Sequence, residues 1–123
     1  MTTTDHILAS LKQLRITYIR DEASLQLKVA DQLAAAGIAF EREVRLDGRS
    51  RVDFLAAGNV AIELKTGKPN SRRTIAQVTR YAAFTRVSTI ILVVERNIFW
   101  LPDDIDGKPV HYVALSSNWG IAL

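Results

Sequence analysis

Residues 51–65 read RVDFLAAGNVAIELK, two short apolar segments separated by a Gly-Asn pair. This pattern predicts two antiparallel strands, at 51–57 and 59–65, because Gly and Asn accept the backbone conformations of tight hairpin turns. Residues 39–46 alternate between apolar and charged side chains, and an Asp-Gly turn signal follows them. The three segments together predict an antiparallel meander.

Helices are expected on both sides of this meander in the sequence. Apolar residues recur at helical spacing in 4–19 and again in 21–36, and Gly37 then ends the second helix. Ser71 is the expected N-cap of a third helix over 72–85. The predicted apolar stripe of the second helix consists of Leu25, Val29 and Leu33, with Leu27, Ala30 and Ala34 beside it.

The continuous β-branched and apolar run at 88–94 predicts a central strand that is buried on both faces. Further strands are expected at 98–101 and 110–115, around a turn at 103–108 in which Gly107 suits a left-handed position. The chain is therefore predicted to be α/β, with a mixed sheet flanked by helices. Its 123 residues are expected to form a single domain, 1–123.

The composition excludes several classes of protein. With 48% apolar and 24% charged residues, the chain resembles an average soluble domain rather than a disordered or fibrous one. It has no apolar run of the roughly 18–20 residues that cross a bilayer, and no signal peptide is recognised, so a membrane is not expected as a partner. The chain has no Cys and only two His, so disulfide bonds and zinc sites are not expected. We expect a cytoplasmic protein in which any metal is a hard cation held by carboxylates.

The positive charge is concentrated in one segment. Between Glu63 and Glu95 the chain has no acidic residue but six of its 16 basic residues. The rest of the chain contains the other ten basic residues and all 13 acidic residues. Such a basic strip is typical of proteins that bind a phosphate backbone. The alternative is a solvated helix face whose counter-charges come from other elements.

Three charged side chains are expected to meet on the meander. Side chains alternate along a strand, so Glu63 and Lys65 point to one face. The turn between the strands places Asp53 near Glu63 or Lys65 across the ladder. A cross-strand ion pair would be the ordinary explanation, but both strands are mostly apolar, and buried charges are usually paired, liganded or functional.

Asp53, Glu63 and Lys65 match the signature of the PD-(D/E)xK nuclease superfamily, the restriction-endonuclease-like enzymes. Glu22 on the second helix corresponds to a Glu that members often carry before the meander. Gln77 and Tyr81 resemble the Q-x-x-x-Y motif of RecB-like members. The predicted element order also resembles the αβββαβ core of the superfamily, and the resemblance covers residues 21–94. Val52 is a departure, because the motif name expects Pro at this position.

The resemblance implies a Mg²⁺ or Mn²⁺ site formed by Asp53, Glu63 and the main-chain carbonyl of Leu64. Glu22 would complete a second metal site or hold a metal-bound water. Lys65 would orient the attacking water or neutralise charge on the transition state. The implied catalytic residues are thus Asp53, Glu63, Lys65 and Glu22. The implied DNA-binding residues are Gln77, Tyr81, Arg73, Arg72, Lys68 and Arg80. Gln77 and Tyr81 would contact the substrate backbone or fix Lys65.

The leading expectation is a metal-dependent deoxyribonuclease that hydrolyses DNA phosphodiester bonds with low sequence specificity, acting as a homodimer. One alternative is a small member that resembles the Holliday-junction resolvases. Another is a non-catalytic nucleic-acid-binding module, or a nuclease subunit that needs a protein partner. Salt-dependent binding without cleavage would favour the last class.

Other residues are weaker candidates. Glu43 lies among alternating charges that more often face solvent. His6 and His111 are expected to be surface or packing residues rather than ligands. Trp100 and Trp119 are able to stack on bases, but core or dimer contacts are the more common role at this chain size.

Overall fold

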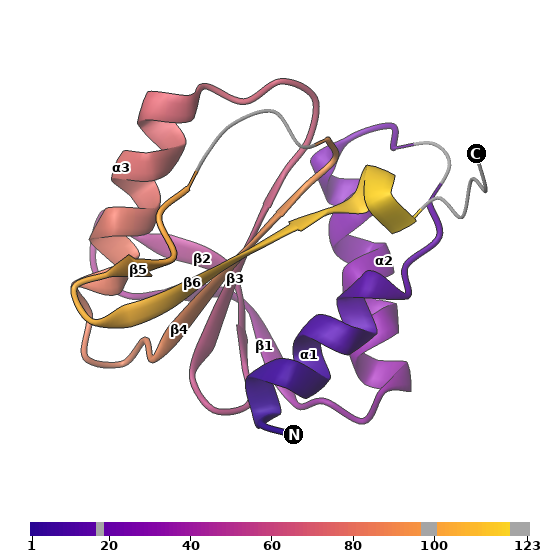
Figure 1. Ribbon diagram of the computed structural model, residues 1–123, viewed down its shortest axis with the longest axis horizontal. Coiled ribbons are helices and arrows are strands. Elements are labelled where there is room, and N and C mark those ends of the chain that lie inside the picture. Colours follow the sequence, from indigo (N-terminus) through magenta and orange to yellow (C-terminus); the bar gives the residue numbers. More distant parts are fainter. Residues whose placement is uncertain (17–18, 97–100, 119–123) are drawn as a thin grey trace.

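The computed structural model describes residues 1–16, 19–96 and 101–118, and the side chains of these residues except 117–118. Within these residues, three helices flank one sheet (Figure 1). Helices α1 (Thr3–Lys12) and α2 (Glu22–Ala35) cover one face, and α3 (Ser71–Ala82) covers the other. No helix in the described part of the chain has the length and apolar character needed to span a membrane.

The sheet has six strands in the order β1-β2-β3-β4-β6-β5. Strands β1 to β3 form the predicted antiparallel meander, β4 and β6 continue the sheet in parallel to β3, and β5 pairs antiparallel with β6. The mixed α/β architecture and the predicted order of helix, three strands, helix and strand are confirmed. The strand bounds are β1 Phe40–Arg45, β2 Arg51–Ala56, β3 Val60–Lys65, β4 Thr89–Val94, β5 Asp104–Ile105 and β6 Lys108–Ala114, with a short 3₁₀ helix at Leu115–Asn118.

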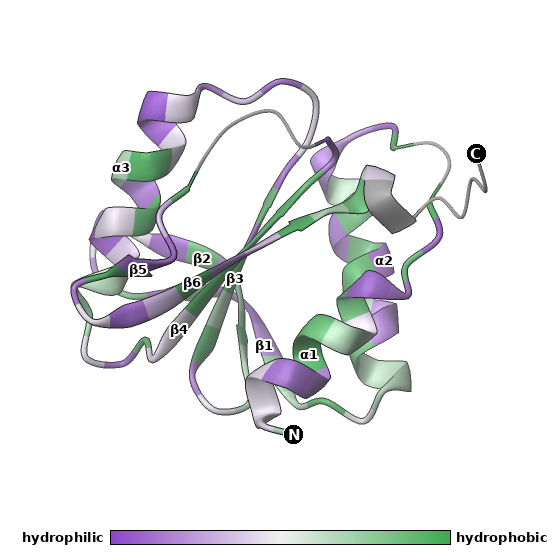
Figure 2. Cartoon of the chain, in the orientation of Figure 1, coloured by the Kyte–Doolittle hydropathy of each residue, from purple (hydrophilic) through white to green (hydrophobic). Residues whose placement is uncertain are grey.

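Each face of the sheet has its own apolar core. Below α1 and α2 lie Phe54, Ile62 and Leu64, and below α3 lie Ile90 and Leu92. Every residue of β4 is buried, which confirms the predicted central strand. Figure 2 shows α3 with bands of hydrophilic residues between hydrophobic ones, as expected for a helix with one face on the sheet.

Several predicted helix details are wrong. The first helix ends at Lys12 rather than 19, because a β-branched and aromatic stretch follows and the Arg15 guanidinium binds the Lys12 carbonyl (3.2 Å). Asn70, not Ser71, caps α3 by accepting the Arg73 N–H at 2.9 Å, and α3 ends at Ala82. In α2, Leu27 and Ala34 are exposed.

Glu43 interrupts the regular geometry of β1. Its φ of 51° lies in the left-handed region, which non-glycine residues seldom adopt. Phe40, on one side of it, packs in the α1/α2 core, whereas Val44 packs in the α3 core. The strand therefore changes the face that it buries at Glu43, opposite Asp53 in the ladder.

The C-terminal region is confirmed in part. Strand β6 occupies the predicted 110–115 region, and Asp106 and Gly107 form the turn with φ values of 53° and 76°. The predicted strand at 98–101 falls largely outside the described residues, as do Trp100 and Trp119.

Candidate functional site

Strands β2 and β3 bring Asp53 and Glu63 together. The antiparallel ladder ends at the pair Phe54–Ile62, and Asp53 and Glu63 are the next residue beyond it on each strand. The Asp53 N–H donates to Glu63 Oε1 at 3.3 Å, and the Leu64 N–H donates to Asp53 Oδ2 at 2.8 Å. The predicted proximity of the two carboxylates is confirmed.

Lys65 lies at the carboxyl end of β3, on the same face as Glu63. Its Nζ is 3.7 Å from Glu63 Oε2. The Lys65 side chain is 23% exposed and that of Glu63 only 6%, so the ammonium group is accessible from solvent while the carboxylate is not. The ion pair thus joins a buried carboxylate to an ammonium group that reaches the surface.

Leu64 contributes its main chain to the site. Its side chain is 1% exposed within the core, yet the residue lines a pocket of about 230 Å³. In an antiparallel ladder the N–H and C=O of one residue point to the same side of the strand. Because the Leu64 N–H meets Asp53, its carbonyl oxygen also faces the Asp53 side.

Glu22 and Glu43 line the same pocket as Asp53. Glu22 is the first residue of α2, after the N-cap Asp21. Its spacing of three and seven residues from the buried Leu25 and Val29 puts it in line with the apolar stripe of α2, but Glu22 is exposed and lines the pocket. Glu43, the weaker candidate, also forms an exposed ion pair, in which its Oε2 lies 3.8 Å from Arg51 Nη1. The remaining pocket residues are Ala23 and Gln26.

The electrostatics of the site disfavour three negative charges. Burial, and then the neighbouring Asp53 charge, raise the pKa of Glu63 to about 8. Burial also raises the pKa of Asp53, against the Leu64 N–H bond, and partial burial raises that of Glu22. Lys65 is the cation that opposes these shifts at all three carboxyls.

Helix α3 contacts the strand that carries Asp53 through the side chain of Tyr81. Tyr81 is 1% exposed, and its hydroxyl donates to the Arg51 carbonyl at 2.9 Å. Burial, followed by the charges of Glu63 and Asp53, raises the pKa of Tyr81. The Tyr81 side chain is thus covered in this structure and ties α3 to β2, and its expected contact with substrate stays a prediction.

Gln77, one turn before Tyr81 on α3, is half-buried. Its Oε1 is buried and has no hydrogen-bond partner among the described residues. In the described part of the chain, no hydrogen bond joins Gln77 or Tyr81 to Lys65. Gln77 is thus a polar side chain beneath the site with bonding capacity to spare.

Apart from Lys65, which pairs with Glu63, the basic residues of the strip are exposed. None of its four candidate DNA-binding residues forms an ion pair within the described part of the chain, so the expected alternative of counter-charges from other elements is not observed there. Two of them occupy the first turn of α3, which has no acidic residue. Cations at that end oppose the helix dipole, so they do not serve helix stability. The four are Lys68, Arg72, Arg73 and Arg80.

The donor set suits a hard cation. Asp53, Glu63 and the Leu64 carbonyl offer oxygen atoms only, the ligands that Mg²⁺ and Mn²⁺ prefer. In residues 1–16, 19–96 and 101–118, no three His, Cys, Asp or Glu side chains form a metal cage by themselves. A cation here would rely on two carboxylates, main-chain oxygen and water, and it would relieve the repulsion among the carboxyls.

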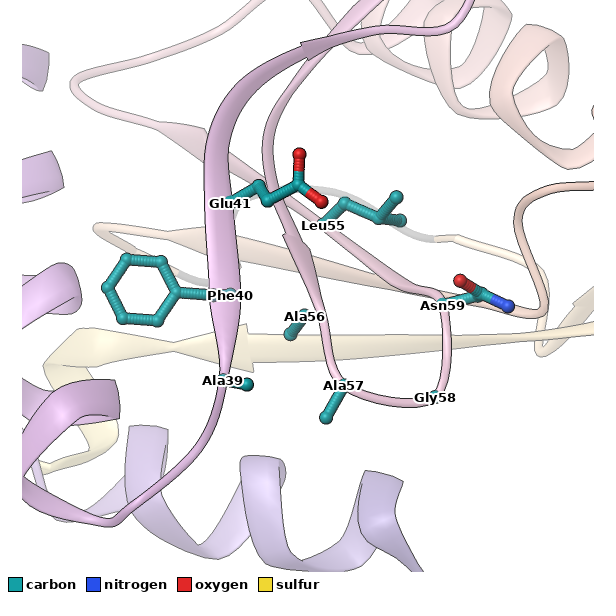
Figure 3. A pocket seen from close by; sticks show the side chains of 8 residues that line it. All are labelled: Ala39, Phe40, Glu41, Leu55, Ala56, Ala57, Gly58 and Asn59. Atoms are coloured by element: carbon teal, nitrogen blue, oxygen red, sulfur yellow. The ribbon is translucent and has the colours of Figure 1, made fainter.

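Other candidate positions lie apart from this pocket. Neither His6 on α1 nor His111 on β6 lines it. Figure 3 shows a second hollow, of about 240 Å³, at the opposite end of β3, where Phe40 and Glu41 point to opposite sides of β1. Glu41 is the single charged side chain that lines this hollow, so it offers no catalytic set.

Two residues that were not expected at the site, Gln26 and Arg42, contact Asp53 directly or through each other. Gln26 Nε2 donates to Asp53 Oδ1 at 3.4 Å, and Arg42 Nη2 donates to Gln26 Oε1. The available signal was spacing, because Gln26 follows Glu22 by four residues and shares its helix face.

Comparisons of the chain with family models, with curated proteins and with solved structures found no match.

Proposed function

We propose that the chain is a metal-dependent nuclease of the PD-(D/E)xK type that hydrolyses DNA phosphodiester bonds with low sequence specificity. The observation that carries this proposal is the convergence of Asp53, Glu63 and Lys65 at the carboxyl end of β3, where Asp53 lines a pocket. The order of helix, three strands, helix and strand from α2 to β4 supports the restriction-endonuclease-like core.

In this proposal Asp53, Glu63 and the Leu64 carbonyl would hold Mg²⁺ or Mn²⁺. The metal supplies Lewis-acid polarisation of the phosphate and a more acidic bound water. Lys65 places a partly exposed ammonium group beside Glu63, where it stabilises negative charge on the phosphate or guides a proton. Glu22 stands at the mouth of the pocket and orients water there.

The function is tested by incubating the chain with single-stranded, duplex and four-way-junction DNA, each with Mg²⁺, Mn²⁺ or EDTA. We expect cleavage with a metal and none with EDTA, and the preferred topology separates a general nuclease from a junction resolvase. Lys65→Ala protein, purified in parallel, reveals any contaminating nuclease. Salt-dependent binding without cleavage on all three substrates would replace the enzyme by a binding module or a partner-dependent subunit.

The basic strip gives a prediction of its own. The double change Arg72→Gln and Arg73→Gln should weaken DNA binding and reduce the slope of log affinity against log salt by up to about two, since each lost phosphate contact removes roughly 0.7–0.9. Fluorescence anisotropy between low and moderate salt measures this slope. Lys12→Gln with Lys28→Gln removes the same charge from α1 and α2, across the sheet. Equal slopes for the two double variants would contradict a role of the strip in DNA binding.

A further inference from the structure

Gln26 joins three elements at the candidate site. It lies on α2, half-buried, and its amide bridges Asp53 on β2 and Arg42 on β1. The Arg42 guanidinium lies over the Phe54 ring, with its Cζ 5.9 Å from the ring centroid. Phe54 is fully buried and adjacent to Asp53 in the chain. This cation–π contact helps to place the guanidinium beside Gln26.

The two partners fix which way the Gln26 amide faces. A guanidinium group donates hydrogen bonds and accepts none, so the amide oxygen must face Arg42. The amide nitrogen then faces Asp53, whose ionised carboxylate accepts hydrogen bonds and donates none. A reversed amide would place its nitrogen, a donor, against the Arg42 donor. It would also place its oxygen, an acceptor, against the Asp53 acceptor.

Asp53 is consequently held by donors at both oxygens. Leu64 N–H binds Oδ2 at 2.8 Å, and Gln26 Nε2 lies 3.4 Å from Oδ1. Each carboxylate oxygen accepts about two hydrogen bonds, so Oδ1 keeps bonding capacity on the pocket side. We propose that Gln26, oriented by Arg42, is a positioning residue that aims Asp53 Oδ1 into the pocket for a divalent cation. This inference rests on the proposed function of the same site.

The test compares Gln26→Leu, Gln26→Glu and Arg42→Met in the full chain. Gln26→Leu should lower Mn²⁺ affinity and cleavage rate about 10–100-fold, the usual effect of losing a partner of a metal ligand. The KM for DNA should stay within about twofold. Gln26→Glu keeps the size of the side chain and the bond to Arg42 but replaces the donor by an acceptor, so it should not restore activity. Arg42→Met should give an intermediate loss.

Two readouts separate this inference from the proposed function. Titration calorimetry of metal-free protein with MnCl₂ measures the affinity without DNA. The side-chain amide signals of Gln26 in a ¹H–¹⁵N spectrum of metal-free wild type should move on Asp53→Asn and on Arg42→Met, whether or not the chain cleaves DNA. Unmoved signals, or full activity and Mn²⁺ affinity in Gln26→Glu, would overturn the positioning role. A wild type that neither binds Mn²⁺ nor cleaves DNA, with amide signals that move as expected, overturns the proposed function instead.

Discussion

Replacing Lys65 by methionine is expected to lower the rate of DNA cleavage by about 10²–10⁴-fold, the range typical of a positioned proton-transfer group. Methionine keeps an unbranched stem but removes the ammonium group that lies 3.7 Å from Glu63 Oε2. Because this group is partly exposed at the end of β3, the fold should tolerate the change. Single-turnover cleavage at saturating Mg²⁺ measures the rate, and anisotropy with Ca²⁺ checks DNA binding.

Lys65→Arg distinguishes the two roles left open for this residue. Arginine keeps the positive charge but does not release its proton in proteins. Partial recovery of the rate would favour charge stabilisation, whereas a loss equal to that of methionine would favour proton transfer. Lys12→Met, the same substitution on α1, should leave the rate unchanged. Wild-type cleavage by Lys65→Met would remove Lys65 from the mechanism.

The meander and the central strand were predictable because local chemistry decides them. Turn residues between the apolar segments fix the register of β2 and β3, and extending this register by one residue brings Asp53 close to Glu63. The continuous apolar run of β4 indicates a strand that is covered on both faces, and every residue of β4 is buried. Local sequence therefore predicted the central pair of carboxylates.

The rest of the site depends on contacts between elements that are distant in sequence. Gln26 reaches Asp53 because α2 packs on the face of the sheet that includes β2 and β3, and periodicity does not predict the rotation of a helix on a sheet. Glu43 enters the pocket through a left-handed backbone conformation that its charged neighbours do not signal. Tyr81 has the expected spacing from Gln77, but its burial follows from how closely α3 approaches β2.

Replacing Glu63 by glutamine is expected to stabilise the metal-free protein, most strongly near pH 8. Burial raises the pKa of Glu63 from 4.5 to about 8 in the folded state. Below pH 4.5 the carboxyl is protonated in both states and imposes no penalty. As the pH rises, the unfolded chain releases the proton first, so the free energy of unfolding falls by up to about 1.4 kcal/mol per pH unit until the folded-state pKa is reached.

Urea unfolding at pH 5, 6, 7 and 8 in EDTA measures this effect. The stability difference between Glu63→Gln and wild type should widen across this range, because an amide does not titrate. Glu41→Gln, at an exposed position on β1, controls for the loss of one acidic residue. Parallel profiles for wild type and Glu63→Gln would show that Glu63 is already ionised near its ordinary pKa.

Divalent metal should reverse the penalty. Saturating Mg²⁺ is expected to raise the free energy of unfolding of the wild type more at pH 8 than at pH 6, because cation binding requires ionised carboxylates. Glu63→Gln should lose most of this gain while keeping its higher stability in EDTA. Such opposite responses would not arise if Glu63 served only as the ion-pair partner of Lys65, since loss of a stabilising pair would not raise the stability in EDTA. The carboxyl at position 63 would then be a group that weakens the empty fold and is stabilised by the cation it binds.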